Sequence, residues 1–304
     1  MELIATAESI GQARKLLEAG INTLYIGEDE FGLRLPTSFS REEQKELVQL
    51  AHEKGNKITV AVNALMHNDR IATVIPYLQF LKEIQVDAIT VGDPGVIHLL
   101  KQHAIDIPYI YDAQTMVTSA NQVNFWAKRG ATGAVLAREL TRDELELISG
   151  QTVVPIEVLV YGATCIHQSK RPLVRNYFNY VGESNVENDR SLFLSEPKKE
   201  ETHYSIYEDR NGTHIFATND VNLAAHLETL SQAGLTQWKL DGLFTKGDVF
   251  VEMAALFNEA RVAIMEGNWS AEYTDHLNER VQQLHPAERA LDEGFFVKNP
   301  EDIQ

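Results

Sequence analysis

Short apolar segments alternate with amphipathic helical segments along the first 160 residues of this chain. Strands buried on both faces of a sheet read as nearly continuous apolar runs, and crossover helices between such strands make the sheet parallel. The pattern therefore predicts a parallel α/β fold. The predicted strands cover residues 2–7, 21–28, 57–65, 88–93, 107–115, 133–139 and 155–162.

Capping residues mark the helices between these strands. Ser9 precedes a helix that is expected to end at Gly20. Ser40 with Glu43, and Thr141 with Glu144, have the spacing of capping boxes, in which each side chain bonds the other residue's backbone amide. These signals predict regular strand–helix units.

A closed barrel and an open doubly wound sheet both suit seven such units. The barrel is favoured because the units repeat evenly and an eighth strand is predicted at 236–244, followed by a helix at 248–267. We therefore expect a TIM-type (β/α)8 barrel with a polar insertion after strand 7. Residues 1–270 would form this single barrel, including the insertion 179–213, which contains a hairpin turn at Asn211–Gly212. Residues 271–304 would form a helical or irregular tail.

Composition limits the classes of function. The chain has 304 residues, a net charge of −17 and one cysteine, Cys165. A single cysteine excludes an internal disulfide and fits a reducing compartment. The acidic charge argues against a broad nucleic-acid-binding surface. No apolar run reaches the length of a membrane span, so we expect a cytoplasmic protein with no membrane contact.

Polar residues follow the predicted strands at their carboxyl ends, where TIM barrels carry their active sites. These residues would surround one barrel mouth, although strand ends also meet solvated loops that are polar for other reasons. Five of them are candidate substrate-binding residues. They are Asn63, Asp112, Gln114, Lys239 and Asp241, and the same ring would include Glu28, Asp93, Arg138 and Glu139.

Cys165 is close in sequence to polar residues that could activate its thiol as a nucleophile. A nucleophilic cysteine needs a base, and His167 is the nearest histidine in sequence. The two-residue spacing alone does not pair them, and a buried apolar cysteine is the competing interpretation. Downstream, Arg171, Arg175 and Asn176 could bind a carboxylate or phosphate, or form a solvated basic loop. No nucleotide-binding, serine-hydrolase or metal motif occurs, so no metal site is predicted.

Several segments together resemble peptidase family U32, historically called the collagenase-like proteases. They extend through about residue 265. The matching segments are GINTLYIGEDEFGLR (20–34), VAVNALMHN (60–68), VDAITVGDPGVIHL (86–99), LARELT (136–141), IEVLVYGATCI (156–166) and WKLDGL (238–243).

The resemblance implies a TIM-type barrel and several functions. Some family members take part in oxygen-independent hydroxylation of RNA bases or of a quinone precursor, and hold an iron–sulfur cluster through four cysteines. The tRNA branch makes 5-hydroxyuridine at the wobble position, with prephenate implied as the oxygen source. In some bacteria this branch comprises a shorter and a longer protein, and this chain is similar to the shorter one.

The chain departs from the family's cysteine motifs, which read roughly E-x-F-x-H-G-A-x-C and then S-G-R-C. Glu157 and Cys165 match, but Tyr161 replaces the histidine and Pro172 replaces the next cysteine. Residues 190–197, where the last two cysteines are expected, contain none. The family's K-I-E-G-R motif becomes KLDGL at 239–243, without the arginine. A [4Fe–4S] cluster needs about four thiolates, so this chain alone should hold no cluster.

Three functions remain open at this level. The first is a subunit for tRNA wobble-uridine 5-hydroxylation, acting with a longer, cluster-bearing paralogue, with tRNA bound through the complex and prephenate as co-substrate. The second is a peptidase, in which Cys165, His167 and Glu157 would be catalytic. The third is a non-catalytic barrel that serves as a scaffold for its partner.

Overall fold

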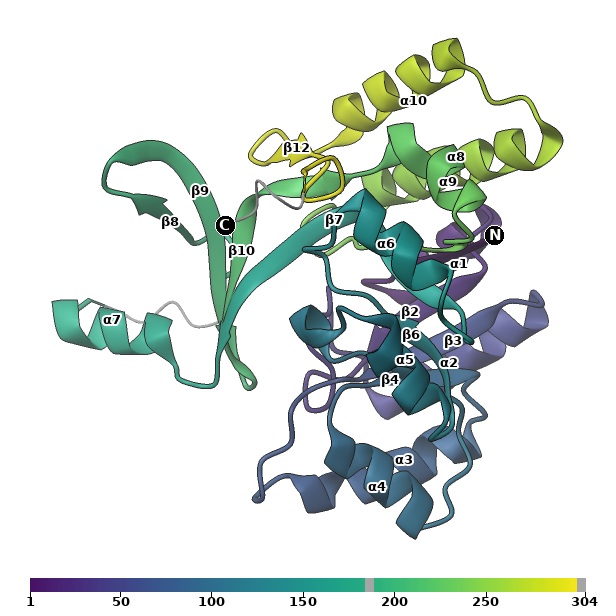
Figure 1. The fold of residues 1–304 in the computed structure, drawn as a ribbon. Helices are drawn as coiled ribbons and strands as arrows, with labels where there is room; N and C mark the ends of the chain where they lie inside the picture. Colours follow the sequence, from purple (N-terminus) through teal and green to yellow (C-terminus); the bar gives the residue numbers. More distant parts are fainter. Residues whose placement is uncertain (184–188, 300–304) are drawn as a thin grey trace.

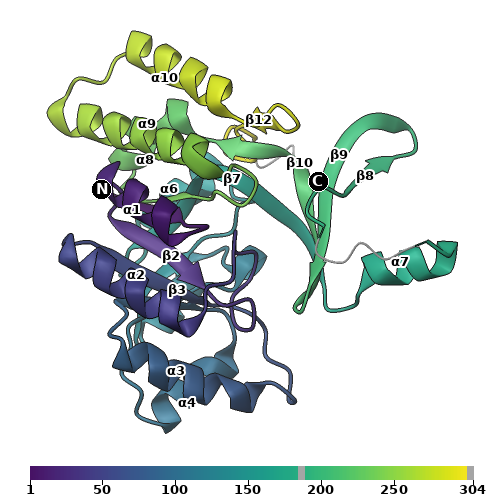
Figure 2. The same ribbon diagram turned by 180° about the vertical axis from the view of Figure 1, so that it is seen from behind.

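Eight parallel strands close into a barrel in the computed structural model, which describes residues 1–183 and 189–299. Each strand pairs with the next, and the last pairs with both the first and the seventh, which closes the barrel (Figures 1 and 2). The predicted TIM-type barrel is thus confirmed. Its strands are β1 (Glu2–Thr6), β2 (Thr23–Gly27), β3 (Lys57–Val62), β4 (Ala88–Val91), β5 (Tyr109–Tyr111), β6 (Ala131–Val135), β7 (Ile156–Ser169) and β11 (Gln237–Leu240).

Helices surround the barrel and begin where the capping residues predict. The side chain of Ser9 accepts a hydrogen bond from the first turn of α1, and capping boxes start α2 and α6. The helices around the barrel are α1 (Ile10–Glu18), α2 (Arg41–Glu53), α3 (Val74–Glu83), α4 (Pro94–Gln102), α5 (Ala120–Ala127), α6 (Arg142–Ser149), α8 (Leu227–Gln232) and α9 (Gly247–Glu266). Short 3-10 turns lie at Ile71–Thr73, Gln114–Met116 and Ala224–His226.

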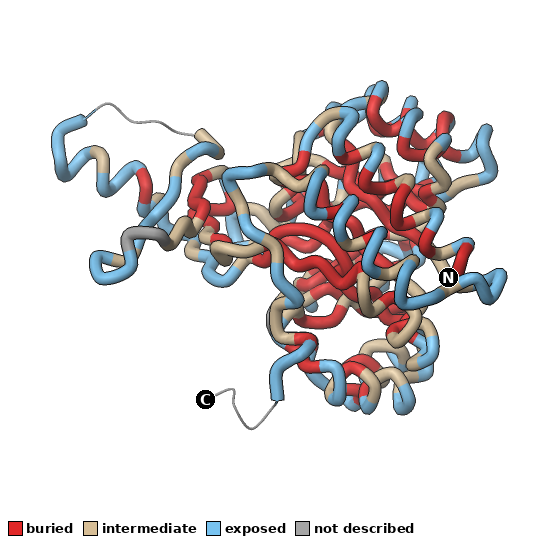
Figure 3. Tube along the Cα trace, turned by 90° about the horizontal axis from the view of Figure 1, so that it is seen from above, coloured by how far each residue is buried: buried red, intermediate tan, exposed pale blue. Residues whose placement is uncertain are grey.

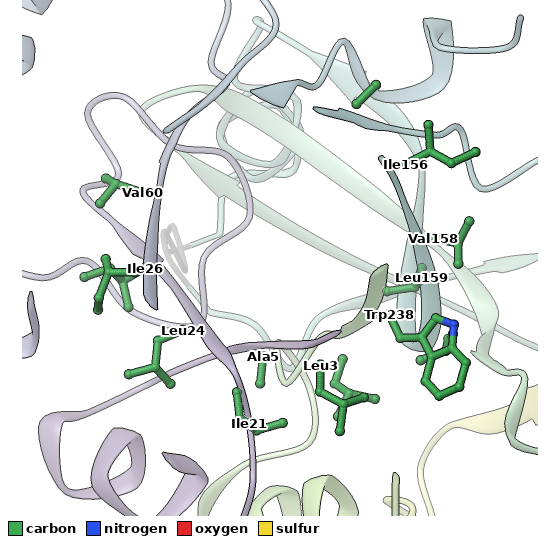
Figure 4. Close-up of a cluster of buried hydrophobic side chains, with 14 of the residues drawn as sticks. Leu3, Ala5, Ile21, Leu24, Ile26, Val60, Ile156, Val158, Leu159 and Trp238 are labelled. Carbon is green, nitrogen blue, oxygen red and sulfur yellow. The ribbon is translucent and has the colours of Figure 1, made fainter. Parts of the chain in front are cut away.

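The main apolar core fills the layer between strands and helices. Leu3, Leu24 and Trp238 are fully buried members of this core (Figure 4). Their neighbours along the strands have a different environment, because successive strand residues point to opposite faces. On β11, Trp238 and Leu240 belong to the apolar core, whereas Lys239 lines a polar cavity inside the barrel. The inner face of the barrel is therefore available for polar chemistry.

Strand β7 continues beyond the barrel and forms the first strand of a projecting arm, which we define as residues 163–222. The arm contains α7 (Leu173–Val181), β8 (Phe193–Glu196), β9 (Lys199–Asp209) and β10 (Gly212–Asn222). β10 pairs antiparallel with both β7 and β9. The arm extends away from the barrel, with α7 and β8 mostly exposed and much of β9 and β10 buried (Figures 1 and 3).

The arm is longer than the insertion expected at 179–213, because the predicted end of strand 7 at residue 162 was too early. β7 runs to Ser169 and β10 runs to Asn222, so the two strands carry the excursion out of the barrel and back. The expected turn at Asn211–Gly212 does connect β9 to β10. Within the expected insertion, residues 184–188 lie outside the described residues.

The C-terminal segment returns to the base of the arm. Helix α10 (Ala271–Leu284) is followed by β12 (Ala290–Asp292), which pairs in parallel with β10. Arg289 forms an ion pair of 2.5 Å with the buried carboxylate of Asp220 on β10. Residues 300–304 of the predicted tail lie outside the described residues. Among the helices that the structure describes, none combines the length and apolar character that a membrane crossing requires.

Candidate functional site

A polar cavity of about 60 Å³ lies inside the barrel at the carboxyl ends of its strands. Side chains from most barrel strands and the loops after them reach it, as expected for the active-site end of this fold. The lining includes nine of the residues that the sequence points to. They are Asn63, Asp112, Gln114, Arg138, Glu139, Glu157, Cys165, Lys239 and Asp241.

A hydrogen-bond network fixes one wall of the cavity. The Nδ2 atom of Asn63, directly after β3, donates to Asp112 Oδ2 at 2.6 Å and to the Tyr25 hydroxyl at 3.3 Å. The other oxygen of Asp112 accepts from the side chain of Gln114 at 2.7 Å. Tyr25 is on β2, Asn63 follows β3, and Asp112 and Gln114 follow β5, so the parallel barrel brings these groups to the same end. The result is a preorganised carboxylate whose oxygens both have donors.

A lysine and a glutamate lie deeper in the barrel. Nζ of Lys239 on β11 is 3.9 Å from Oε1 of Glu157 on β7, and 3.1 Å from the centre of the Tyr25 ring. Burial lowers the pKa of Lys239, while Glu157 opposes that shift. Burial likewise raises the pKa of Glu157, while Lys239 opposes the shift. Burial thus opposes the charge on each group, while the opposite charge of the partner favours it, so the protonation of the two groups is coupled.

The side chain of Arg138 contacts both the barrel and the arm. Arg138, after β6, donates to the backbone carbonyl of Ala163 and lies 3.6 Å from Asp241. Gly162 lets the backbone of β7 pass close to Asp241, since its φ is +126° and a Cβ atom there would lie 2.6 Å from the carbonyl oxygen of Asp241. The point where β7 leaves the barrel is therefore also a wall of the cavity.

A second arginine enters the cavity from the loop after β2. Arg34 donates to the side chain of Gln114 and to that of Gln168 on the arm. Arg34 and Gln114 both adopt left-handed backbone angles, with φ of +54° and +58°. Such angles are strained for side chains of this kind and concentrate at functional sites. This strain supports a functional role for the cavity.

Cys165 lies where the arm meets the cavity, and its neighbouring base is His214. The His214 imidazole on β10 is fully buried, and its Nε2 atom lies 3.0 Å from Asp209 on β9. Burial alone would raise the pKa of the Cys165 thiol, but His214, Arg34 and Arg138 together lower it. The thiol also donates to the backbone carbonyl of His167 at 3.3 Å.

The remaining sequence candidates lie outside the cavity. The His167 side chain is exposed, and only its backbone carbonyl contacts Cys165. Arg171, Arg175 and Asn176 are exposed at the start of α7 on the arm, and Arg175 lies 3.4 Å from Glu208. The structure thus divides the candidates between a barrel cavity and an arm surface.

Two members of the expected polar ring have local structural roles. Glu28 lies 3.4 Å from Arg41 and accepts from Gln44. Asp93 caps α4 by accepting from the amide of Gly95 at 2.7 Å. Neither lines the cavity.

The residues present do not fit the family's iron–sulfur cluster. Cys165 is the only thiol in the chain, and Tyr161 is engaged by Thr245 and His285, each at 2.8 Å. Pro172 precedes the first turn of α7 on the arm. Within residues 1–183 and 189–299, no group of three or more histidine, cysteine or acidic side chains is arranged to hold a metal ion.

The residues missed by the sequence reasoning are Tyr25, Arg34 and His214. Tyr25 resembles any buried aromatic residue in an apolar strand, and Arg34 lies in a loop whose path the sequence does not define. His214 follows the predicted hairpin turn by two residues. That hairpin could have placed His214 opposite β7 only if the extension of β7 had been recognised.

Comparisons with known proteins agree with this architecture. The model of peptidase family U32 matches residues 8–304. The chain is 37% identical over 303 residues to tRNA hydroxylation protein P2 of Bacillus subtilis, covering 98% of this chain and 97% of that protein. It is 26% identical to tRNA hydroxylation protein P1 of the same bacterium, covering 79% of this chain and 58% of P1.

A solved structure shows the same fold. The U32 peptidase Mk0906 aligns with a TM-score of 0.50 and 15% identity, covering 79% of this chain and 92% of that one. The family model spans nearly the whole sequence, and the arm and every barrel strand except β1 lie within the matched range. The chain therefore belongs to peptidase family U32.

Proposed function

We propose that this chain is a subunit of a tRNA hydroxylation system that forms 5-hydroxyuridine at the wobble position. The observation that carries the proposal is the end-to-end similarity to tRNA hydroxylation protein P2, at 37% identity over 98% of the chain. The polar barrel cavity supports it, because a reaction site requires preorganised charged groups that water alone does not provide.

The proposed partner is a longer, cluster-bearing paralogue. With one cysteine, this chain lacks the thiolates for the family's cluster, so a redox centre would have to come from another protein. Bacillus subtilis has relatives of both kinds, P2 and the longer P1, which fits a two-protein system. Purified chain and paralogue should form a complex at micromolar concentration, and failure to associate would count against the proposal.

The cavity residues would bind the small-molecule co-substrate, and the arm residues would bind tRNA. The cavity cations, Arg138 and Lys239, would attract the carboxylates of a small acid, and prephenate is the proposed co-substrate. The arm presents exposed Arg171, Tyr177 and Tyr180, which suits contact with tRNA through phosphate pairing and base stacking. In an acidic protein, the partner would supply most of the remaining basic surface.

The test is mass spectrometry of tRNA nucleosides from a deletion strain grown without oxygen. Loss of 5-hydroxyuridine derivatives, restored by the wild-type gene, is the expected result. Unchanged nucleosides in the deletion strain, with other hydroxylation genes also removed, would overturn the proposal. Complementation with Arg171→Ala, and with Asp112→Asn or Lys239→Met where the variant protein accumulates to the wild-type level, then separates catalysis from a scaffold role, because a scaffold that is still folded would support modification in each case.

The second candidate function is peptidase activity, which the name of the family indicates. It is favoured by the thiol of Cys165, whose pKa is lowered despite burial, as cysteine nucleophiles require. Peptide hydrolysis by the purified chain that disappears in Cys165→Ala would support this candidate. Hydrolysis that survives the substitution would come from another group or a contaminant.

A further inference from the structure

Three side chains from three strands of the arm stand in the order thiol, imidazole and carboxylate. Cys165 is on β7, His214 on β10 and Asp209 on β9. Strand β10 lies between β7 and β9 in the sheet, and the Nε2 atom of His214 is 3.0 Å from Asp209 Oδ1. A nucleophile, a base and a group that orients the base form the recurring arrangement of covalent catalysis.

Strand irregularity brings the thiol and the imidazole together. Ile215 pairs with His167 and Phe216 pairs with Cys165, so Ile166 is an extra residue on β7 at this step. Such a bulge changes the direction of the side chains around it and is common beside active sites. It places Cys165 opposite Phe216, which lies two residues from His214 on β10 and therefore on the same face of that strand.

The imidazole has one nitrogen that no structural contact uses. His214 is fully buried, and its Nδ1 atom has no hydrogen-bond partner among the described residues. A buried polar atom without a partner is costly unless it serves a reaction. Since Nε2 is bonded to Asp209, Nδ1 is the atom that can take the thiol proton.

The groups around the Cys165 thiol favour both its ionised form and the binding of an anionic ligand beside it. Arg34 and Arg138 act on Cys165 from two different barrel loops, and both line the cavity that the thiol reaches. Thr164, the preceding residue, is buried in the same lining, and within the described chain its hydroxyl has no partner. Two guanidinium groups and one free hydroxyl are the donors that a carboxylate needs.

We propose that Cys165 is a nucleophile activated by His214 and Asp209, and that the cavity beside it binds a small electrophile bearing a carboxylate. In the reaction, the Sγ proton moves to His214 Nδ1 and the thiolate attacks the electrophilic carbon. When the reagent is a haloacetate, a C–S bond forms, the carbon–halogen bond breaks and halide leaves. Asp209 is a positioning residue that stabilises the resulting imidazolium. This inference does not depend on tRNA hydroxylation.

The charged and titratable groups that act on the thiol or on its base come from every element packed around them. Their sum decides the pH profile of the reaction. Burial opposes ionisation of the thiol, and the cations favour it. The groups are Asp29 and Arg34 from the loop after β2, Arg138 from the loop after β6, Tyr207 and Asp209 from β9, and His214 from β10.

Alkylation of the intact chain tests the proposal directly, because Cys165 is the only thiol. Rates with iodoacetate and iodoacetamide are measured from pH 5 to pH 10, with free cysteine as the reference. The expected kinetic pKa is below about 8.5, the value of an ordinary thiol. The ratio of the iodoacetate rate to the iodoacetamide rate should exceed that of free cysteine severalfold, because the arginines attract the carboxylate.

Variants assign the roles. His214→Gln should slow alkylation at pH 7 by about tenfold, since an ordinary thiol is only a few per cent ionised there. Asp209→Asn should have a smaller effect in the same direction, and Arg34→Met should reduce the iodoacetate rate selectively. His167→Gln is the matched control, and its rates should equal those of the wild type.

The wild-type measurement decides the proposal even if His214→Gln fails to fold. An ordinary kinetic pKa together with the reagent ratio of free cysteine would overturn it. A lowered kinetic pKa that persists in folded His214→Gln would overturn the role of the imidazole. The same measurement needs neither tRNA nor a partner, so its failure is distinct from failure of the proposed function.

Discussion

Nζ of Lys239 lies 3.9 Å from Oε1 of Glu157, and both side chains are buried inside the barrel. Taking two charges out of water is costly, and their attraction offsets the cost only while both partners remain. The Tyr25 ring under the ammonium group adds a cation–π contact at 3.1 Å. This pair therefore couples the eighth barrel strand to the seventh through charge.

Removing both partners of this pair should lower the free energy of unfolding by less than the sum of the two single losses. Lys239→Met is expected to lower the free energy of unfolding by about 3–5 kcal/mol, because it leaves Glu157 buried without a counter-charge. The double variant Lys239→Met/Glu157→Gln should lose less than the two single variants together. Urea unfolding of all four proteins measures the coupling, and strictly additive losses would contradict it.

The interaction of His214 with Asp209 should make stability depend on pH. Burial acts to lower the pKa of His214, but Asp209, bonded to Nε2, and the nearby Cys165 outweigh it and raise the pKa. A histidine with a raised pKa contributes stability below its unfolded pKa of about 6.5 and loses that contribution as pH rises through the folded value.

The difference in unfolding free energy between wild type and Asp209→Asn should therefore be largest below about pH 6.5. It should decrease as the pH rises above that value. Denaturant unfolding at several pH values from 5.5 to 9 measures this difference. A difference that grows with pH would show that the sign is wrong.

Gly162 should be much less tolerant of substitution than another glycine with positive φ. At Gly162, with φ of +126°, an alanine Cβ would also lie 2.6 Å from the backbone oxygen of Asp241. Gly182, with φ of +76°, has no atom within 4 Å of the same position. Gly162→Ala should cost about 3 kcal/mol or more, and Gly182→Ala about 1–2 kcal/mol. Thermal or urea unfolding compares the two, and equal losses would contradict the close approach at Asp241.

The barrel could be predicted from sequence because its strands and helices are locally encoded. Continuous apolar runs such as residues 57–62 identify buried parallel strands, and Ser40 with Glu43 marks a helix start. The polar residues after these strands, such as Asn63 and Asp112, could then be placed at one mouth because parallel strands end on the same side. The observed cavity is lined by both of them.

The arm could not be predicted in the same way, because its strands are specified by distant pairing. Residues 164–169 are mostly polar, so nothing local extends β7 beyond the barrel. Their partner strand lies more than 40 residues downstream, and bulges shift the register between them. The neighbour of Cys165 is consequently His214, which depends on that register, whereas sequence proximity pointed to His167. The left-handed backbone of Arg34 likewise depends on tertiary contacts rather than on local preference.

The arm surface and the barrel cavity should be separable by substitution. Tyr180 is 90% exposed and Arg171 is also exposed on the arm, so Tyr180→Ala and Arg171→Ala should change stability by less than about 0.5 kcal/mol. Under the proposed function, both variants should weaken tRNA binding by the complex, since stacking and phosphate contacts are lost. The loss from Arg171→Ala should shrink at high salt, where phosphate contacts contribute less.

Asn63→Ala provides the contrasting change in the cavity. It removes the 2.6 Å hydrogen bond to buried Asp112 and should cost about 1–3 kcal/mol, while leaving tRNA affinity at the wild-type level. Titration of labelled tRNA with the complex, alongside urea unfolding of each variant, gives both quantities. Wild-type tRNA affinity in Tyr180→Ala and Arg171→Ala together would remove the arm from the RNA contact and leave it as a surface for the partner protein.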